Sequence, residues 1–348
     1  MSQRRLLVPG PVVVRPPFAG RTTRVPMTKI AVLDDYQKRA AGYADWGSLG
    51  PDVEVVFFHD PISQAALAQT LGDFEVLVLM RERTAFPRTV LEALPKLRLL
   101  VTTGMRNASV DIEYLNERGV VVSGTGGLGG PPPPGIPSTA EVAWALIFAV
   151  SKRVTVEDRA MRGGRWQLGL PTVLAGATLG LAGLGHLGSA MVGPARAFGM
   201  EVIAWSQNLT EDRAVKLGVG KVAKEELLSR SDVVSIHLVL SERTRGLFRA
   251  GDLALMKPTA VLINTSRGPI VDEQALIAAL RNGTIAGAGL DVYDGEPLPA
   301  GHELALLDNV VLLPHLGYVN EAGFRQMYVQ VVEDVAAFLH GSPVRELQ

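Results

Sequence analysis

Three side chains suited to acid–base chemistry lie far apart in the sequence: Arg267, Glu296 and His315. An imidazole can both donate and accept a proton near neutral pH. Taken singly, each residue has an ordinary interpretation, as a surface ion pair, a turn carboxylate or a hydrogen-bonded histidine. All three, however, follow the carboxyl ends of predicted strands, where open α/β sheets bind ligands. They occur in the segments INTSRGPIVDEQAL (263–276), GAGLDVYDGEPL (287–298) and LLPHLGY (312–318).

A glycine-rich segment, GLAGLGHLGSA (180–190), follows a predicted strand and precedes a predicted helix. It holds the spacing Gly183-x-Gly185-x-x-Gly188, which in this strand–loop–helix context indicates a dinucleotide site. Gly183 would allow the tight turn, Gly185 would let the backbone approach a pyrophosphate, and Gly188 would let the helix pack on the strand. The pyrophosphate would lie at the helix N-terminus, where unpaired N–H groups point outward.

The residue expected to bind the adenosine ribose is not acidic in this chain. A carboxylate usually bonds the ribose of NAD about twenty residues beyond the glycines. Here the strand EVIAW (201–205) is followed by Ser206-Gln207-Asn208. A Ser or Asn can bond a 2′-hydroxyl, nothing there would repel a 2′-phosphate, and Arg213 is the nearest basic residue. The sequence therefore predicts a dinucleotide without choosing between NAD and NADP.

The elements that must position these residues form two α/β series. Short runs rich in Val, Ile and Leu alternate with helical segments, a pattern typical of a parallel sheet covered on both faces. In the first series the runs are KIAVL (29–33), VEVVFF (53–58), FEVLVLM (74–80), LRLLV (97–101) and GVVVS (119–123). In the second they are ATLGLAG (177–183), EVIAW (201–205), DVVSIHL (232–238), AVLINTS (260–266), IAGAGLDV (285–292) and NVVLLP (309–314).

Two helices outside these series are also predicted. Ser138 should cap an almost entirely apolar helix, with Glu141 completing a capping box. Such a helix must be buried, and we expect it between domains or subunits. Periodicity does not place the last helix, 321–341, in either series.

Composition excludes several classes of protein. A length of 348 residues allows two domains, and a net charge of −1 gives no case for binding nucleic acid or a membrane surface. The longest apolar run, VAWALIFAV (142–150), is far shorter than the roughly 18 residues that span a bilayer. The absence of cysteine excludes disulfides and thiolate chemistry and is compatible with the cytoplasmic location that we expect. The histidines are dispersed and no carboxylates cluster at ligand spacing, so no metal is expected.

The ordered motifs resemble the D-isomer-specific 2-hydroxyacid dehydrogenase family from about Lys29 to the C-terminus. They are the glycine loop, SDVVSIHL, LINTSRGPIVDEQAL, AGLDVYDGEPL and PHLGY. The resemblance implies an α/β fold with two open parallel sheets, in which a Rossmann domain (138–317) is inserted into a flavodoxin-like substrate-binding domain (29–137 with 318–348). It also implies a homodimer through the apolar helix 140–150 and its flanking arm, which contain Trp144 and Trp166.

The resemblance further implies an NAD(P)-dependent enzyme that interconverts small 2-oxo and 2-hydroxy acids. His315 would exchange the proton, Glu296 would orient the imidazole and favour its charged form, and Arg267 would bind the substrate carboxylate. Further substrate contacts are expected at Arg83, Thr103 and Gly104. The predicted cofactor-binding residues are Thr139, Gly183, Gly185, His186, Leu187, Gly188, Ser206, Gln207, Val239, Thr265 and Asp291.

Three departures from the family pattern leave alternatives open. Ser206 replaces the usual acid, Val239 stands where proline is common, and Tyr318 stands where many members have a small residue. Formate dehydrogenases share the fold but carry Gln at the position of Glu296. Phosphite dehydrogenases keep the Arg, Glu and His set. A dinucleotide-sensing corepressor would bind the cofactor tightly with negligible turnover.

Two unusual segments complete the sequence. Residues 1–28 are Arg-rich and free of acids, and we expect a disordered extension, with organelle targeting as the alternative. The stretch GGPPPPGIP (129–137) is an insertion relative to the usual short family loop, and four prolines favour stiff polyproline II. It either borders the substrate cleft, where it would limit access or hinge motion, or is a tolerated surface bulge.

Overall fold

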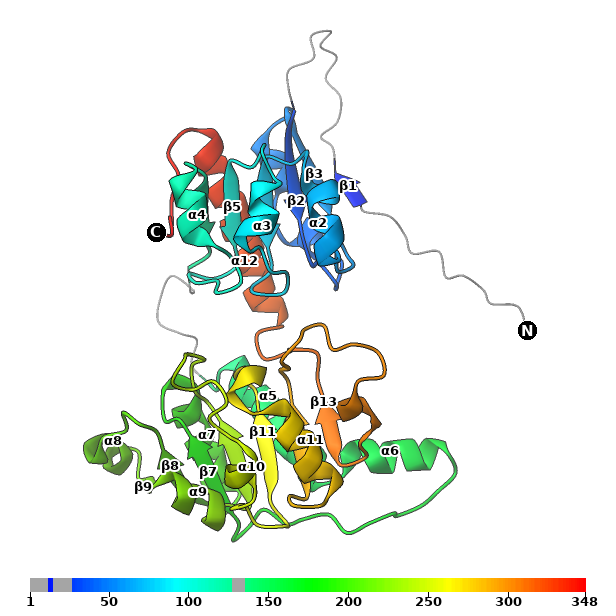
Figure 1. Ribbon diagram of the computed structural model, residues 1–348, viewed down its shortest axis with the longest axis vertical. Helices are drawn as coiled ribbons and strands as arrows, with labels where there is room; N and C mark the ends of the chain where they lie inside the picture. The colour runs from blue at the N-terminus through cyan, green and yellow to red at the C-terminus, as the bar shows by residue number, and fades with distance from the viewer. Residues whose placement is uncertain (1–11, 15–26, 127–134) are drawn as a thin grey trace. The chain divides into compact units, whose positions relative to one another are not determined.

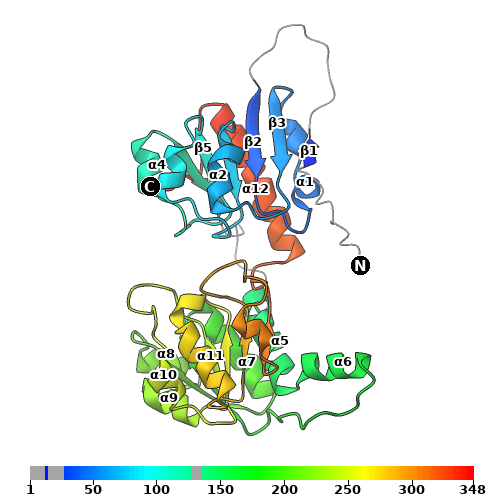
Figure 2. The ribbon, with the colours of Figure 1, turned by 45° about the vertical axis from the view of Figure 1, so that its right-hand side comes forward.

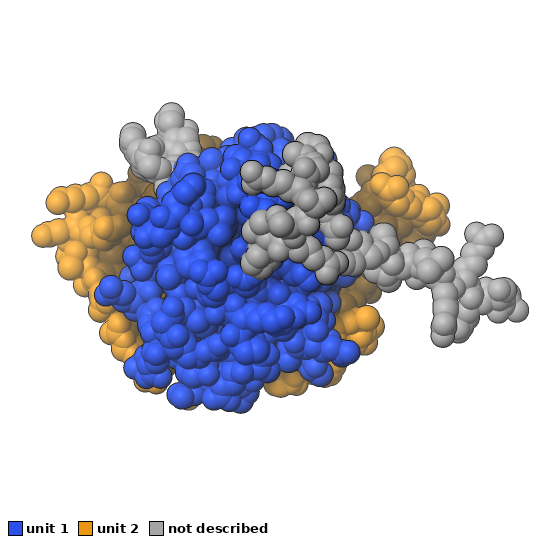
Figure 3. All heavy atoms as spheres, turned by 90° about the horizontal axis from the view of Figure 1, so that it is seen from above, with its two compact units in different colours: residues 1–133, 321–348 blue, residues 134–320 orange. Residues whose placement is uncertain are grey.

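The computed structural model describes residues 12–14, 27–126 and 135–348 of the chain. Two compact units, coloured separately in Figure 3, make up the molecule. Unit 1 combines Met1–Pro133 with Glu321–Gln348, and unit 2 is the continuous stretch Pro134–Asn320. The proline run Pro131–Pro134 and most of the N-terminal extension lie outside the described residues, so the predictions made for them remain predictions.

Unit 1 is built on a six-stranded sheet with the order β1-β3-β2-β4-β5-β6. The five longer strands pair in parallel because each is connected to the next through a helical segment. The strands are β1 (Val12–Val14), β2 (Thr28–Val32), β3 (Val53–Phe57), β4 (Val76–Leu79), β5 (Leu99–Thr102) and β6 (Val121–Gly124). The helices are α1 (Ala40–Tyr43), α2 (Gln64–Leu71), α3 (Arg88–Glu92), α4 (Ile112–Glu117) and α12 (Glu321–Leu339), with a 3-10 turn η1 (Trp46–Leu49).

Helices cover both faces of this sheet. Leucines of α2, α3 and α4 pack against one face, whereas α12 lies on the other beside α1, β5 and β6 (Figures 1 and 2). Tyr328 of α12 is 1% exposed, and its ring lies 6.3 Å from that of Trp46, which in turn packs edge-on against Phe57. The last helix, which periodicity did not place, therefore supplies part of the core of unit 1.

Part of the predicted N-terminal extension is ordered. Val12–Val14 form β1, which pairs antiparallel with β3 from Val12 opposite Phe57 to Val14 opposite Val55. The prediction of a disordered extension stays a prediction, because the other residues of the extension up to residue 26 lie outside the described ranges. A three-residue β-branched run gains order here by adding backbone hydrogen bonds to the exposed edge of the sheet.

Unit 2 is built on a seven-stranded, fully parallel sheet with the order β13-β12-β11-β10-β7-β8-β9. From β7 the chain adds β8 and β9 on one side of the sheet, and it then adds β10 to β13 on the other side. The carboxyl ends of β7 and β10 are therefore the topological switch point of the sheet. The strands are β7 (Thr178–Ala182), β8 (Glu201–Trp205), β9 (Gly220–Lys221), β10 (Val233–Ile236), β11 (Val261–Asn264), β12 (Gly287–Leu290) and β13 (Val310–Leu312).

Two apolar clusters bury the two faces of this sheet, one beneath α5 and α7 and the other beneath α9, α10 and α11 (Figure 1). The helices are α5 (Ser138–Ser151), α6 (Val154–Arg162), α7 (His186–Ala197), α8 (Glu211–Lys216), α9 (Lys224–Arg230), α10 (Ala250–Leu253) and α11 (Glu273–Arg281), with 3-10 turns η2 (Gly268–Ile270) and η3 (Glu303–Leu306).

The apolar helix α5 packs on β11, β12 and β13 and against α7. Its Trp144 is 5% exposed and lies against the rings of Phe148 and Phe198, so the helix is buried within unit 2 itself. The predicted cap is wrong, because Pro137 is the N-cap residue, Ser138 is already helical, and no side chain caps the helix.

The prediction of an α/β fold with two largely parallel sheets is confirmed. Within the described ranges, no helix is long and apolar enough to cross a membrane. The same residues contain no group of three or more His, Asp or Glu side chains that could hold a metal ion.

Candidate active site

The glycine loop joins β7 to α7 through a turn that only glycine fits. Gly183 has a φ of +103°, and a Cβ atom on it would lie 2.5 Å from the carbonyl oxygen of His237. A Cβ atom on Gly188 would lie 2.1 Å from the carbonyl oxygen of Gly183. The two residues therefore let α7 start close against the strand ends, as the spacing predicted.

Gly185 differs from the other two glycines of the loop. It precedes the first residue of α7, and a Cβ atom on it would meet nothing within 4 Å. Its α-carbon faces open space at the N-terminus of a twelve-residue helix, where N–H groups favour an anion. Packing does not demand glycine here, whereas close approach of a ligand to the backbone would.

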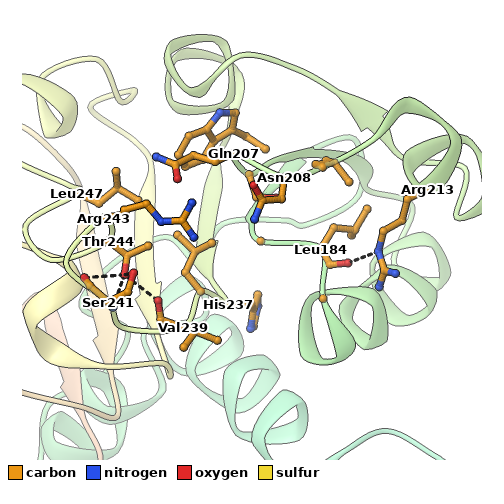
Figure 4. Close-up of a pocket in the computed structure, with 16 residues that line it drawn as sticks. Leu184, Gln207, Asn208, Arg213, His237, Val239, Ser241, Arg243, Thr244 and Leu247 are labelled. Carbon is orange, nitrogen blue, oxygen red and sulfur yellow. Dashed lines mark hydrogen bonds between the residues drawn. The ribbon is translucent and has the colours of Figure 1, made fainter. Parts of the chain in front are cut away.

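A pocket of about 500 Å³ opens beside this loop, at the carboxyl ends of β7, β8 and β10 (Figure 4). Five of the predicted cofactor residues line it: Gly183, Gly185, Gln207, Val239 and Ser206, the last at the position of the missing acid. The switch point of an open α/β sheet is the place where such folds bind dinucleotides.

Asn208, which the sequence offered as a partner of the ribose, also lines the pocket, whereas several other lining residues were not identified from the sequence: Leu209, Ser241, Arg243, Thr244 and Leu247. Those beyond Val239 belong to a loop after β10 that Thr244 organises, because its hydroxyl bonds the carbonyl oxygen of Val239 at 2.7 Å. Their only signal in the sequence is that they follow a strand next to the switch point. Burial lowers the pKa of His237, which also lines the pocket, to about 4, so that ring is neutral.

The imidazole of His315 and the carboxylate of Glu296 form a hydrogen-bonded pair. Nδ1 of His315 lies 2.7 Å from Oε2 of Glu296, and the N–H of Tyr293 donates to Oε1 at 3.0 Å. The carboxylate can only accept, so Nδ1 carries a proton and donates it to Glu296. Both side chains remain partly accessible, with 22% of His315 and 27% of Glu296 exposed.

The backbone after β13 is held by a buried carboxylate. Asp291 is fully buried and accepts hydrogen bonds from the N–H groups of Leu316 and Gly317, at 2.6 and 2.8 Å. Burial raises the pKa of Asp291, while the two backbone donors and nearby His315 act in the opposite direction. Thr139 donates from Oγ1 to the carbonyl oxygen of Gly317 at 2.8 Å, so the predicted cofactor residues Thr139 and Asp291 meet at this glycine.

Arg267 lies on the same sheet edge, directly after β11. The register of β11, β12 and β13 places Asn264 beside Leu290 and Leu290 beside Leu312, so the loops bearing Arg267, Glu296 and His315 are neighbours. Gly268 packs against the loop after β12 so closely that a Cβ atom would lie 2.1 Å from the carbonyl carbon of Tyr293. Strand order thus brings all three predicted residues to one edge of unit 2.

The positions of the remaining predicted cofactor residues, Thr265, His186 and Leu187, are compatible with a bound dinucleotide. Thr265 is 5% exposed, and its hydroxyl has no hydrogen-bond partner among the described residues, which is costly unless a ligand supplies one. His186 and Leu187 begin α7, and neither lines the pocket beside β8.

The predicted substrate contacts of unit 1 are already engaged within that unit. The N–H groups of Thr103 and Gly104 donate to the carbonyl oxygen of Leu79 and to Oγ1 of Thr125, both at 2.9 Å. Arg83 donates to the carbonyl oxygen of Asp34 at 2.6 Å. Arg106, by comparison, is exposed and has no hydrogen bond or ion pair with any described residue.

Comparisons with known proteins agree with these features. The family described as D-isomer specific 2-hydroxyacid dehydrogenase, NAD binding domain, matches residues 144–317. A glyoxylate reductase of Korarchaeum cryptofilum is 36% identical over 81% of this chain and 84% of its own length. One of Aeropyrum pernix is 37% identical over 83% and 87%.

Solved structures give the same result. The crystal structure of a phosphoglycerate oxidoreductase of Vibrio cholerae superposes with a TM-score of 0.82 at 35% identity, and the match covers 91% of this chain and all of that one. Sequence and fold agree over most of the chain. It therefore belongs to the D-isomer specific 2-hydroxyacid dehydrogenase family, whose members are NAD(P)-dependent oxidoreductases.

Proposed function

We propose that this enzyme reduces a small 2-oxo acid of the glyoxylate type to the corresponding 2-hydroxy acid, with NADH or NADPH as the reductant. The hydrogen-bonded pair of His315 and Glu296, on the same sheet edge as the glycine loop, is the observation that carries the proposal. Relatives named glyoxylate reductase point to the same substrate. The Glu296 carboxylate, where formate dehydrogenases have Gln, favours a reaction that needs a proton donor.

His315 is assigned the proton transfer. Its Nδ1–H is committed to Glu296, which leaves Nε2 to give a proton to the carbonyl oxygen of the substrate. Glu296 is itself fixed by the N–H of Tyr293, so the ring keeps one orientation, and the carboxylate stabilises the imidazolium. The bound nicotinamide supplies the hydride that the carbonyl carbon receives.

Arg267 is assigned the role of binding the substrate. Its guanidinium carries a permanent charge and several donors, which suits it to hold the carboxylate of a 2-oxo acid and to polarise the adjacent carbonyl. In unit 1, Arg83, Thr103 and Gly104 remain proposed contacts. Because their backbone and guanidinium donors are partly engaged, the accessible Arg106 is the better anion anchor on that unit.

The aromatic ring of Tyr318, next to His315, favours a small substrate. Tyr318 packs edge-on against His315, with the ring centres 5.1 Å apart. A phenol at this distance occupies volume beside the proposed proton donor and favours a substrate with a short side chain.

An assay of the purified protein tests the proposal. Glyoxylate, pyruvate, hydroxypyruvate and 3-phosphohydroxypyruvate would each be mixed with NADH or NADPH, and cofactor oxidation would be followed by absorbance. We expect turnover with at least the smallest acids. Tight cofactor binding without oxidation on any acid would instead favour a sensing protein, and oxidation of phosphite or formate would replace the proposed reaction.

We also propose a homodimer formed through the arm that follows α5. The segment from α6 to β7 exposes large apolar side chains in unusual number, with Trp166 at 71%, Val173 at 68% and Leu170 at 95%. Such a surface marks an interaction site. Replacing Trp166 and Leu170 together with Glu should convert a dimer into a monomer in light scattering, whereas a wild-type monomer would refute the proposal.

A further inference from the structure

The pocket beside the glycine loop is positively charged. Its side chains include two arginines, Arg213 and Arg243, but no aspartate or glutamate. His237 contributes no charge because its ring is neutral. NAD-binding folds usually have an acidic residue here, which bonds the hydroxyls of the adenosine ribose and repels a 2′-phosphate. This pocket has no such residue.

The two arginines differ in what already binds them. Arg213 donates from Nε to the carbonyl oxygen of Leu184 at 2.8 Å, and its Nη2 lies 3.4 Å from Oγ of Ser189. Its guanidinium therefore braces the glycine loop. The sequence had made Arg213 the nearest basic candidate for a 2′-phosphate, but its donors are partly engaged on protein oxygens.

Arg243 has no such engagement. It forms no hydrogen bond or ion pair with any described residue, and its chain neighbour Glu242 does not line the pocket. Figure 4 shows its guanidinium directed into the pocket towards Gln207, from the side opposite Arg213. An arginine held in a pocket without an anion to bond is suited to a ligand that brings the anion.

Neutral donors complete the same region. Ser206, Gln207 and Asn208 follow β8, where the adenosine ribose of a dinucleotide lies in this fold. Their hydroxyl and amide groups can donate to phosphate oxygens without repelling them. With Arg243 on the facing loop, phosphate on that ribose would meet donors from two sides.

We propose that Arg243 selects NADP(H) over NAD(H) by binding the 2′-phosphate, together with the Ser206–Asn208 segment. This assignment rests on the proposed function, because it refines the cofactor of that reaction. The residue that distinguishes the two cofactors, Arg243, therefore lies in the loop after β10. The dinucleotide-binding motif would instead predict such a residue at the end of β8.

Equilibrium binding tests the assignment without requiring turnover. Wild-type protein and the variant R243Q would be titrated calorimetrically with NADPH, NADH, adenosine 2′,5′-bisphosphate and AMP; the last two differ only in the 2′-phosphate. We expect the wild type to bind NADPH at least about tenfold tighter than NADH. In R243Q the Kd for NADPH and for the bisphosphate should rise about 10- to 100-fold, the value of one charge-assisted contact, with NADH and AMP changed less than about threefold.

R245Q is the matched control, because Arg245 lies in the same loop but does not line the pocket. It removes the same charge, so a general electrostatic effect would appear in both variants and would overturn the assignment. Equal wild-type affinity for NADPH and NADH, or an equal loss of both in R243Q, would also overturn it. If the wild type bound neither dinucleotide, the proposed function would be overturned together with the role of Arg243. The results described above would overturn the role of Arg243 alone.

Discussion

Replacing His315 with alanine is expected to lower kcat for 2-oxo acid reduction by between about 10²- and 10⁴-fold, the usual contribution of a positioned general acid. The Kd for the dinucleotide should stay within a factor of about two. The reason is geometric: His315 lies after β13, whereas the pocket assigned to the adenosine half lies beside β7, β8 and β10. Stopped-flow turnover and calorimetric binding measure the two quantities separately.

Glu296→Gln provides the control for this result. The amide keeps the size of the side chain and can still accept a hydrogen bond from Nδ1, but it has no charge to stabilise an imidazolium. We expect a smaller loss of kcat than in H315A, of about 10- to 100-fold. If H315A retained wild-type kcat, or if E296Q were more damaging than H315A, the proton would have to come from another group.

The second large effect is expected at Arg267. Arg267→Gln should lower kcat/KM by about 10³-fold, because it removes both the charge that binds the substrate carboxylate and a donor aimed at the reacting carbonyl. Both a higher KM and a lower kcat should contribute. Steady-state kinetics with glyoxylate and a fixed saturating concentration of cofactor would resolve the two.

Arg267→Lys separates charge from geometry. Lysine keeps the charge but lacks the planar fork of donors, so most of the loss should persist in kcat while KM recovers in part. A circular dichroism melt would show whether both variants keep the thermal stability of the wild type, because Arg267 is next to Gly268, which packs closely against Tyr293. Unchanged kinetics in R267Q would remove Arg267 from the site.

The strands of both sheets could be predicted because most of them are short, apolar runs buried on both faces. EVIAW coincides with β8, and the other long strands differ from the predicted runs by a few residues at their ends. Two strands gave no such signal. β9 is only Gly220–Lys221, and β1 is three residues, so both depend on backbone pairing at an edge and not on an apolar pattern.

The site was predictable to the extent that it follows strand ends. The glycine spacing predicted the close turn between β7 and α7. The register of β11 to β13 brings together residues that are up to 48 positions apart, from Arg267 to His315. Arg243 could not be predicted in this way. It lies in an irregular loop whose path depends on the Thr244 hydroxyl, and such side-chain contacts leave no periodic pattern. The roles of Arg267, Glu296 and His315 stay predictions.

The hydrogen bond between Thr139 and Gly317 joins two residues that are 178 positions apart in the chain. One stands in the first turn of the first helix of unit 2 and the other in its last loop, so the unit begins and ends at the same point. A stretch whose ends already touch can be inserted into, or exchanged between, host genes without rerouting the surrounding chain. The glycine loop and all three proposed reactive residues therefore lie within one uninterrupted stretch of chain whose two ends are joined by a hydrogen bond.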